Sequence, residues 1–223
     1  MYFFRKNRYT TFHLSPPHRM ITQYLFVPLD KIFKPPEPMK TELEKMRSEE
    51  LYSFADPEVF ASIARSQKLC ARLRTMTMYD EHYRKTLEEL IPGIPQSSMI
   101  CPPFHCDHGT GIQLDENVFI NYNAVMLDSA YIRIGKNTKI GPNCQFYTPA
   151  HPMDYMERRK PQETGHPITI GEDCWLGGGV IVCPGVTIGH RCIIAAGSVV
   201  TQNIPDDSLA AGVPAVVKRR LKK

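Results

Sequence analysis

Residues 168–200 read ITIGEDCWLGGGVIVCPGVTIGHRCIIAAGSVV, and this stretch decides the fold. Aliphatic residues recur in it at every sixth position, namely Ile170, Leu176, Val182, Ile188, Ile194 and Val200. An α-helix repeats about every 3.6 residues and a simple strand alternates, so neither explains this spacing. A period of six predicts short strands wound into a solenoid, in which each turn packs against its neighbours.

The same period marks a second inward position and extends towards the N-terminus. Small residues lie four positions after the aliphatic ones, at Cys174, Val180, Val186, Cys192 and Ser198. The phase also fits earlier in the chain, at Ile134, Ile140 and Phe146, and more weakly at Ile112, Val118 and Ala124. A mainly β coil is therefore predicted over residues 100–204.

The period fails twice, near residues 128–132 and within residues 151–167. In a solenoid an interruption becomes a loop that leaves the coil, and such loops commonly carry the function. Both breaks are therefore predicted to lie beside the functional site.

Charge and hydropathy exclude two kinds of partner. The net charge of +4 is carried entirely by residues 1–38, and the neutral remainder argues against a nucleic-acid-binding face. No apolar run approaches the length of a membrane span. Three of the seven cysteines (Cys144, Cys174 and Cys192) occupy inward repeat positions, which predicts reduced core residues and a cytoplasmic protein.

Both ends of the chain are expected to lie outside the coil. Residues 1–38 are predicted to be an extension without a packed core. Their basic, acid-poor start is compatible with an organelle transit peptide, and they can equally be sequence ahead of a start at Met39. Residues 205–223 form a C-terminal segment that ends in a basic tail.

Helices are predicted for residues 39–99. A polar helix is expected over residues 39–51, a second begins at Asp56-Pro57-Glu58, and Asp80 is expected to cap a third. An open solenoid needs a cover over its first turn, because exposed strand edges promote aggregation. These helices are therefore predicted to cap the coil.

Short blocks beside the repeat narrow the identification. They include ELY at 50–52, DPE at 56–58, PPFHCDHG at 102–109, NYN at 121–123, TPAHP at 148–152, WLGGG at 175–179 and AGVPA at 211–215. With them, residues 39–220 resemble the maltose and galactoside O-acetyltransferase group of hexapeptide-repeat enzymes. The resemblance implies a left-handed parallel β-helix with an N-terminal helical cap, and a homotrimer with active sites between subunits. It also implies acetyl transfer from acetyl-CoA to a sugar hydroxyl.

Among the eight histidines, His151 is distinguished by its position at the start of the second break. Acetyl transfer from a thioester to a hydroxyl needs a base that is largely unprotonated near neutral pH yet able to hold a proton, which suits histidine. A lone loop histidine is more often structural. The resemblance, however, implies that the histidine of the TPAHP block is the general base, so His151 is the predicted catalytic residue.

Four residues are expected to bind the acceptor. The resemblance implies that Asn121 contacts the sugar and that Asp128 matches an acidic position near it. Ser129 stands where the galactoside enzymes have a second acid, which leaves the sugar open. Asp56 matches an acceptor-binding acid, although helix capping explains its position equally well.

Acetyl-CoA is the expected donor, lying in the groove between subunits. The glycines 177–179 beside Trp175 offer backbone N–H groups that can stabilise a tetrahedral oxyanion, although glycines also serve turns. The resemblance implies acetyl-CoA contacts from Trp175, Gly178, Ala196, Thr201, Gln202 and Arg219. Gln202 stands where a lysine is common, so the phosphates are expected to meet Arg219 and the tail.

Metal-dependent alternatives are less well supported by the residues. A γ-class carbonic anhydrase needs three histidines converging on zinc, but His166 is fifteen residues from His151 and no third is placed beside them. The cluster Cys101, His105, Cys106 and His108 lacks a second pair at zinc-finger spacing. No metal is therefore expected.

Two further alternatives concern the coil itself. A catalytically silent scaffold is possible, but it gives no reason to combine His151 and Asn121 with a break in the repeat. An acetyl-cysteine intermediate is conceivable, yet the inward thiols are expected to be buried and poorly nucleophilic. Direct transfer within a ternary complex is therefore predicted.

Overall fold

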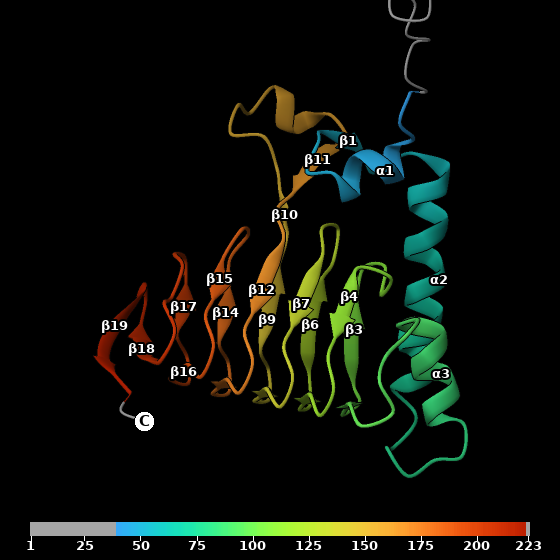
Figure 1. Cartoon of the computed structure of the whole chain (residues 1–223). Coiled ribbons are helices and arrows are strands. Elements are labelled where there is room, and N and C mark those ends of the chain that lie inside the picture. The colour runs from blue at the N-terminus through green and yellow to red at the C-terminus, as the bar shows by residue number, and fades with distance from the viewer. Residues whose placement is uncertain (1–38, 222–223) are drawn as a thin grey trace, which may run out of the picture. The chain divides into compact units, whose positions relative to one another are not determined.

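The chain winds through three flat sheets that form the sides of a prism (Figure 1). The computed structural model describes residues 39–221. The extension predicted for residues 1–38, and Lys222 and Lys223 of the basic tail, lie outside the described residues. Each complete turn passes in order through a seven-stranded, a five-stranded and a four-stranded sheet.

The strands are short and regularly spaced. The seven-stranded sheet contains β2 (Met99–Ile100), β5 (Phe119–Ile120), β8 (Lys139–Ile140), β13 (Trp175–Leu176), β16 (Ile193–Ile194), β18 (Ser208–Gly212) and β19 (Ala215–Arg220). The five-stranded sheet contains β3 (Phe104–Cys106), β6 (Ala124–Leu127), β9 (Gln145–Tyr147), β14 (Ile181–Val182) and β17 (Val199–Val200). The four-stranded sheet contains β4 (Ile112–Leu114), β7 (Ile132–Ile134), β12 (Ile168–Ile170) and β15 (Thr187–Ile188). Pairing in these sheets is parallel except between β18 and β19, so the predicted parallel coil is confirmed.

The six-residue period sets the register between turns. Ile170 pairs with Ile134 on one side and with Ile188 on the other, so aliphatic residues stack on one another along the sheet. All six aliphatic positions of the repeat are at most 1% exposed, and the small inward residues are at most 2% exposed. Burial of each aliphatic side chain contributes about 1.5–3 kcal/mol, which makes the stacked column the core of the fold.

Three rows of corners join the sheets, and they are named here in chain order. The first corner leads from the seven- to the five-stranded sheet, the second from the five- to the four-stranded sheet, and the third back to the seven-stranded sheet. The third corner is built from left-handed residues, such as Asn117, Asn137 and Asp173, whose side chains hydrogen-bond in a column. Asn and Asp tolerate this conformation better than other non-glycine residues, so the corners stack without strain.

The N-terminal helices cover the first turn of the coil, as predicted. They are α1 (Glu42–Arg47), α2 (Pro57–Leu73) and α3 (Tyr83–Leu90). Leu73, Leu87 and Leu90 are buried in one cluster with the aliphatic residues of the coil. The first helix is shorter than predicted because the capping box of Thr41 and Glu44 starts it late and Ser48 ends it.

The prediction that Asp80 caps the third helix is wrong. Its carboxylate accepts hydrogen bonds from the backbone N–H and the hydroxyl of Thr77, so it closes a turn before the helix. The helix begins at Tyr83, after His82, which makes no side-chain cap.

The second break is an ordered excursion. Strands β10 (Pro149–Ala150) and β11 (Gln162–Gly165) pair as an antiparallel ribbon, with a 3₁₀ turn (Glu157–Arg159) between them. The far edge of β11 pairs with β1 (Tyr52–Ser53), which lies between α1 and α2. The excursion thus connects the middle of the coil to the helical cap (Figure 1).

No helix within residues 39–221 is both long and apolar enough to cross a membrane.

We predict that Gly171→Ala destabilises the protein by about 1–3 kcal/mol, because overpacking against backbone cannot be relieved by side-chain movement. A Cβ at Gly171 would lie 2.6 Å from the backbone carbon of Gly189 and from the backbone nitrogen of His190. Chemical denaturation measures the effect. Gly178→Ala is the control, since its nearest contact would be 3.3 Å. Equal stability of the two variants would contradict the tight stacking of the coils.

Candidate active site

The excursion brings together residues that are far apart in the sequence. His151 directly follows β10, and Glu163 lies on the returning strand β11. Glu163 pairs across the ribbon edge with Tyr52 of the cap. These residues come together because β11 runs antiparallel to β10. The chain therefore returns to the second corner, where the excursion began.

His151 and Glu163 form a pair at the mouth of the excursion. His151 Nε2 lies 3.7 Å from Glu163 Oε2. The imidazole is half exposed, at 53%, whereas the carboxylate is only 13% exposed. The ring of Phe54 meets the imidazole edge-on, with the ring centroids 6.1 Å apart. A solvent-facing imidazole beside a shielded carboxylate can take up a proton and have the resulting charge stabilised.

The other carboxylate oxygen of Glu163 is held from two directions. Glu163 Oε1 accepts hydrogen bonds from the Tyr52 hydroxyl and from the Ser129 hydroxyl, the latter at 3.3 Å. Burial, followed by the contact with Glu163, raises the pKa of Tyr52 well above its ordinary value, so the phenol remains a donor. Ser129, a predicted acceptor ligand, is only 1% exposed, and the contact of its hydroxyl is with Glu163.

Two further carboxylates lie at the second corner. Asp128 is fully buried, and its two oxygens accept the backbone N–H groups of His108 and Gly111 at 2.8 and 2.9 Å. Burial, then the charges of Asp128 and Glu163, raise the pKa of Asp107 to about 7. Asp128 thus stabilises the turn that contains His108 and Gly111. Its contact with an acceptor stays a prediction.

A groove runs along the first corner and contains four of the predicted ligands. It has a volume of about 470 Å³, and its walls include Asn121, Trp175, Gly178 and Ala196. Successive turns lie so close together here that a Cβ at Gly177 would be 2.6 Å from the backbone nitrogen of Ala196. A larger residue than glycine therefore does not fit at this position. Trp175 is 57% exposed and contributes an aromatic wall to the groove.

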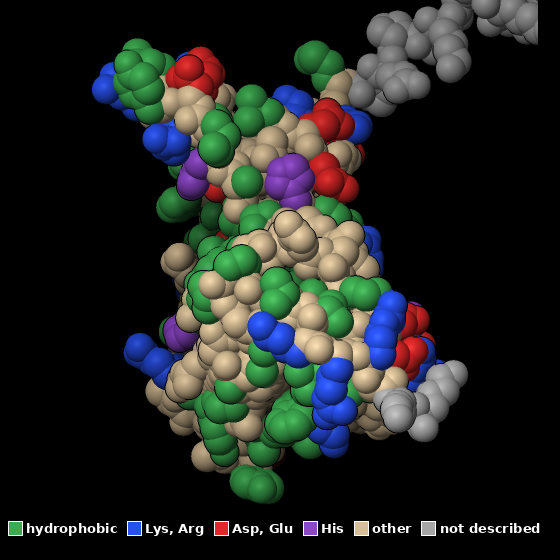
Figure 2. All heavy atoms as spheres, turned by 90° about the vertical axis from the view of Figure 1, so that its left-hand side faces the viewer, with side chains coloured by type: hydrophobic (Ala, Val, Ile, Leu, Met, Phe, Trp, Pro, Cys, Tyr) green, Lys and Arg blue, Asp and Glu red, His purple; other side chains and the backbone are tan. Residues whose placement is uncertain are grey.

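The remaining predicted ligands lie elsewhere. Thr201 and Gln202 follow β17 at the second corner, and Arg219 lies on β19 at the C-terminal end of the coil. Figure 2 faces this end and shows Lys and Arg side chains gathered there among apolar ones. Asp56 caps α2 by accepting the backbone N–H groups of Glu58 and Val59.

The first and second corners lie at opposite edges of the five-stranded sheet. Asn121 therefore does not meet His151 within one chain. Gly178 and Ala196 lie at the first corner, Thr201 and Gln202 at the second, and Arg219 at the C-terminal end of the coil. The predicted site residues of one chain therefore fall into separate groups.

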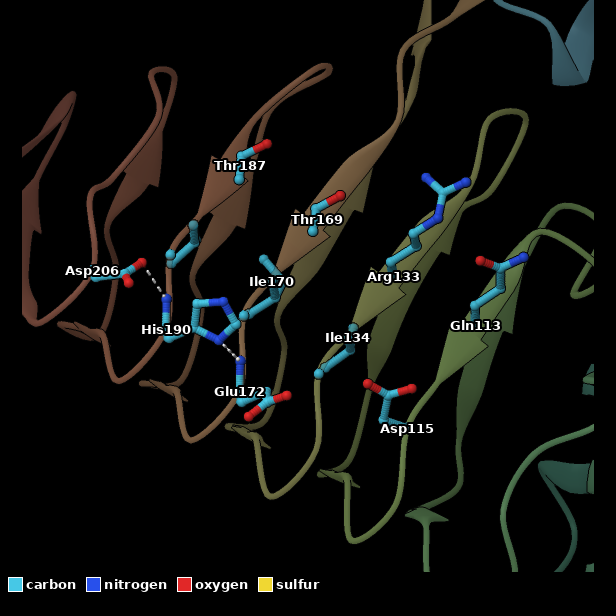
Figure 3. A pocket seen from close by; sticks show the side chains of 14 residues that line it. Gln113, Asp115, Arg133, Ile134, Thr169, Ile170, Glu172, Thr187, His190 and Asp206 are labelled. Atoms are coloured by element: carbon cyan, nitrogen blue, oxygen red, sulfur yellow. Dashed lines mark hydrogen bonds between the residues drawn. The ribbon is translucent and has the colours of Figure 1, made fainter.

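A second hollow lies apart from the first and second corners. About 410 Å³ in volume, it is lined by outward residues of the four-stranded sheet and by the third corner (Figure 3). His190 lies in this hollow. Its ring Nδ1 accepts a hydrogen bond from the backbone N–H of Glu172, and its backbone N–H donates to the carboxylate of Asp206. Its polar groups thus serve to join neighbouring turns, and none of the predicted site residues lines it.

The residues that suggested a metal are dispersed. The Cys106 thiol lies 3.9 Å from that of Cys70, His108 Nδ1 lies 3.0 Å from the hydroxyl of Ser62, and Cys101 contacts Met78. Burial lowers the pKa of His108 to about 4. Within residues 39–221, no group of three or more His, Cys, Asp or Glu side chains is arranged to hold a metal ion.

Comparison with known proteins decides the family. Residues 167–202 match the family model described as bacterial transferase hexapeptide (six repeats). Nodulation protein L of Rhizobium leguminosarum bv. viciae is 42% identical over 180 residues, which cover 80% of this chain and 95% of that protein. The chain belongs to the hexapeptide-repeat acetyltransferases.

Solved acetyltransferase structures match most of this chain. A hexapeptide-repeat acetyltransferase from Vibrio cholerae O1 biovar eltor, complexed with acetyl-CoA, is 40% identical with a TM-score of 0.77. The match covers 82% of this chain and 100% of that one. A maltose O-acetyltransferase from Clostridium difficile 630 is 35% identical with a TM-score of 0.80, over 82% and 99% of the chains. The left-handed parallel β-helix implied by the resemblance is thereby confirmed.

The sequence analysis of this acetyltransferase missed three residues of the site. Tyr52 and Asp107 lie inside the ELY and PPFHCDHG blocks, where their residue types alone could have suggested a polar role. Glu163 stands in no motif, because its importance comes from the return path of the excursion. Only the pairing of β11 with β1 and β10 reveals it.

We predict that Asp107→Asn becomes more stabilising, relative to the unchanged protein, as the pH rises from 5 to 8. The folded state holds the Asp107 proton up to about pH 7, whereas the unfolded state releases it near the ordinary aspartate pKa of 3.8. The stability that the protonated carboxyl contributes is therefore present at low pH and lost as the pH rises through 7. Denaturation curves at several pH values measure a difference on the order of 1–3 kcal/mol. A difference independent of pH would contradict the raised pKa of Asp107.

Proposed function

We propose that this acetyltransferase moves the acetyl group of acetyl-CoA to a hydroxyl of a sugar, with His151 as general base. The observation that carries the proposal is the exposed imidazole of His151 held beside the shielded carboxylate of Glu163. The relatives support the choice of substrates, since one is complexed with acetyl-CoA and another is a maltose O-acetyltransferase.

The chemistry needs one base and one oxyanion donor. The acceptor hydroxyl oxygen attacks the thioester carbonyl while its proton passes to His151, and a C–O bond forms. The carboxylate of Glu163 stabilises the positive charge that the ring gains, since an opposite charge within about 4–6 Å favours the charged form. When the C–S bond breaks, the proton passes from the ring to the departing CoA thiolate, so atoms and charge balance.

One backbone donor suits the oxyanion. Among the predicted glycines, the Gly177 and Gly179 N–H groups donate to the carbonyls of Ile194 and Pro142. The coil thus uses two of the three N–H groups, and within the described residues the third, on Gly178, is the one left for a ligand. Preorganised backbone donors of this kind contribute about 3–4 kcal/mol to acyl transfer.

The groove at the first corner suits a long, thin donor. Its floor contains Gly141, Gly178 and Ala196, contributed by successive turns about 4.8 Å apart. Small residues in such a row leave room for an extended chain such as the pantetheine arm, with Trp175 as a packing wall. The basic end of the coil, including Arg219, is the proposed contact for the CoA phosphates.

We propose that the site is completed in a homotrimer. The outward residues of the five-stranded sheet are largely apolar and partly exposed, including Val125, Ile181 and Val199. Those of the four-stranded sheet are polar, including Arg133 and Thr187. Threefold packing through the five-stranded faces would place the first corner of one subunit against the second corner of the next.

The proposed compartment is the cytoplasm. All seven cysteines are free thiols, which suits a reducing environment. The compartment also supplies acetyl-CoA.

We predict that His151→Asn lowers kcat for acetyl transfer by about 10²–10⁴-fold, because the hydroxyl proton loses its acceptor. Calorimetry should show unchanged binding of coenzyme A, since His151 is proposed to contact the acceptor hydroxyl and is not among the predicted acetyl-CoA ligands. His166→Asn is the matched control, being a partly exposed histidine at the other end of the excursion and 3.8 Å from Glu49. Near-normal turnover of the His151 variant would refute the assignment.

We also predict that two inactive variants complement each other. A subunit with His151→Asn retains Asn121, and a subunit with Asn121→Ala retains His151. If each site draws these residues from two chains, subunits mixed equally and reassembled regain about a quarter of the full activity. Thiol release from acetyl-CoA measures the recovery. Mixtures as inactive as their components would contradict a site shared between subunits.

A further inference from the structure

The two oxygens of Glu163 have different neighbours. Oε2 faces His151, whereas Oε1 accepts the hydroxyls of Tyr52 and Ser129. When one oxygen of a carboxylate is held by hydrogen bonds, the direction of the other oxygen is fixed as well. Tyr52 and Ser129 therefore set the orientation in which Glu163 faces His151.

We propose that Tyr52 of the helical cap is a positioning residue for the base, acting through Glu163. The inference rests on the proposed function of His151. It adds a role for the cap, which would otherwise only cover the end of the coil.

Tyr52 is itself immobile. Its side chain is 2% exposed and packs in a small cluster with Met46 and Val59 of the helices. Its backbone pairs with that of Glu163 through the β1–β11 ladder, so both ends of the hydroxyl–carboxylate contact are fixed to the same two strands. Contacts anchored in this way lose little entropy when they form, which is the requirement for a positioning group.

Ser129 provides the second anchor, and the cap holds it as well. The Arg47 guanidinium, at the end of α1, donates to the carbonyl oxygens of Asp128 and Ser129 at 2.5 and 2.9 Å. Arg47 also lies over the ring of Tyr131, 5.3 Å from its centroid. The two hydroxyl groups that donate to Glu163 therefore both depend on residues 42–53. Tyr52 belongs to this segment, and Arg47 of the same segment holds the backbone of Ser129.

The test removes one hydroxyl and compares it with a matched one. Tyr52→Phe deletes the contact with Glu163 while keeping the ring. Tyr83→Phe is the control, because Tyr83 is also buried in the cap but donates to the backbone carbonyl of Ile100 at 2.8 Å. Thermal denaturation establishes that both variants fold.

We predict that Tyr52→Phe lowers kcat by about 10–100-fold, as small misplacement of a catalytic group does, with an unchanged KM for acetyl-CoA. Its pH–rate profile should change in shape, whereas that of Tyr83→Phe should not. Glu163→Gln should show a similar loss, and combining it with Tyr52→Phe should add little, because both act through one contact. Additive losses, or equal losses in the two tyrosine variants, would overturn the proposal.

A second readout does not depend on activity. In protein labelled with ¹³C-histidine, the ring signals of His151, assigned by their absence in His151→Asn, should move in Tyr52→Phe and stay in place in Tyr83→Phe. Ser129→Ala should move them in the same way if Tyr52→Phe does not fold. If no acceptor is acetylated, the proposed function fails while these signals still test the positioning role. Unmoved His151 signals in both Tyr52→Phe and Ser129→Ala would overturn it.

Discussion

Each turn of the coil is bonded to the next through parallel backbone hydrogen bonds, and this fixed register is the constraint on which the rest of the structure depends. It is maintained by stacked aliphatic residues such as Ile134, Ile170 and Ile188, and by corners too close for side chains at Gly171 and Gly177. A coil held at about 4.8 Å per turn cannot absorb an insertion internally. Extra residues must leave at a corner, and they leave at the second one.

The excursion is therefore an ordered segment, and it carries the proposed base. His151 directly follows β10, which pairs with β11, and Glu163 on β11 is fixed to the cap by pairing with β1. His151 and Glu163 therefore lie in a paired ribbon between the coil and the cap, and not in a free loop. The same geometry explains why a shielded carboxylate can lie beside an exposed imidazole: the cap covers one and leaves the other open.

The sequence predicted the coil closely because its determinants are local, since a period of six survives in any single stretch of a few turns. The helix from Pro57 to Leu73 was equally readable from its proline and its cap. Glu163 was not predictable, because its contact with His151 depends on how an antiparallel ribbon returns. Nor could the spacing show that Asn121 and His151 occupy opposite edges of one sheet. The first and second corners of a turn are separated by only one short strand, so a small error in the assigned phase moves a residue from one edge to the other. Asp80 was misread because a carboxylate that can cap a helix can also close a turn.

We propose that one chain supplies the base and its neighbour supplies the groove. The decisive experiment is a crystal structure of the protein with coenzyme A and an acetylated sugar. We expect a trimer in which the CoA sulfur lies beside Gly178 of one subunit, with the sugar oxygen between that sulfur and the imidazole of the next subunit's His151. Coenzyme A bound in the groove with no His151 of any subunit within hydrogen-bond reach of the sugar would contradict it.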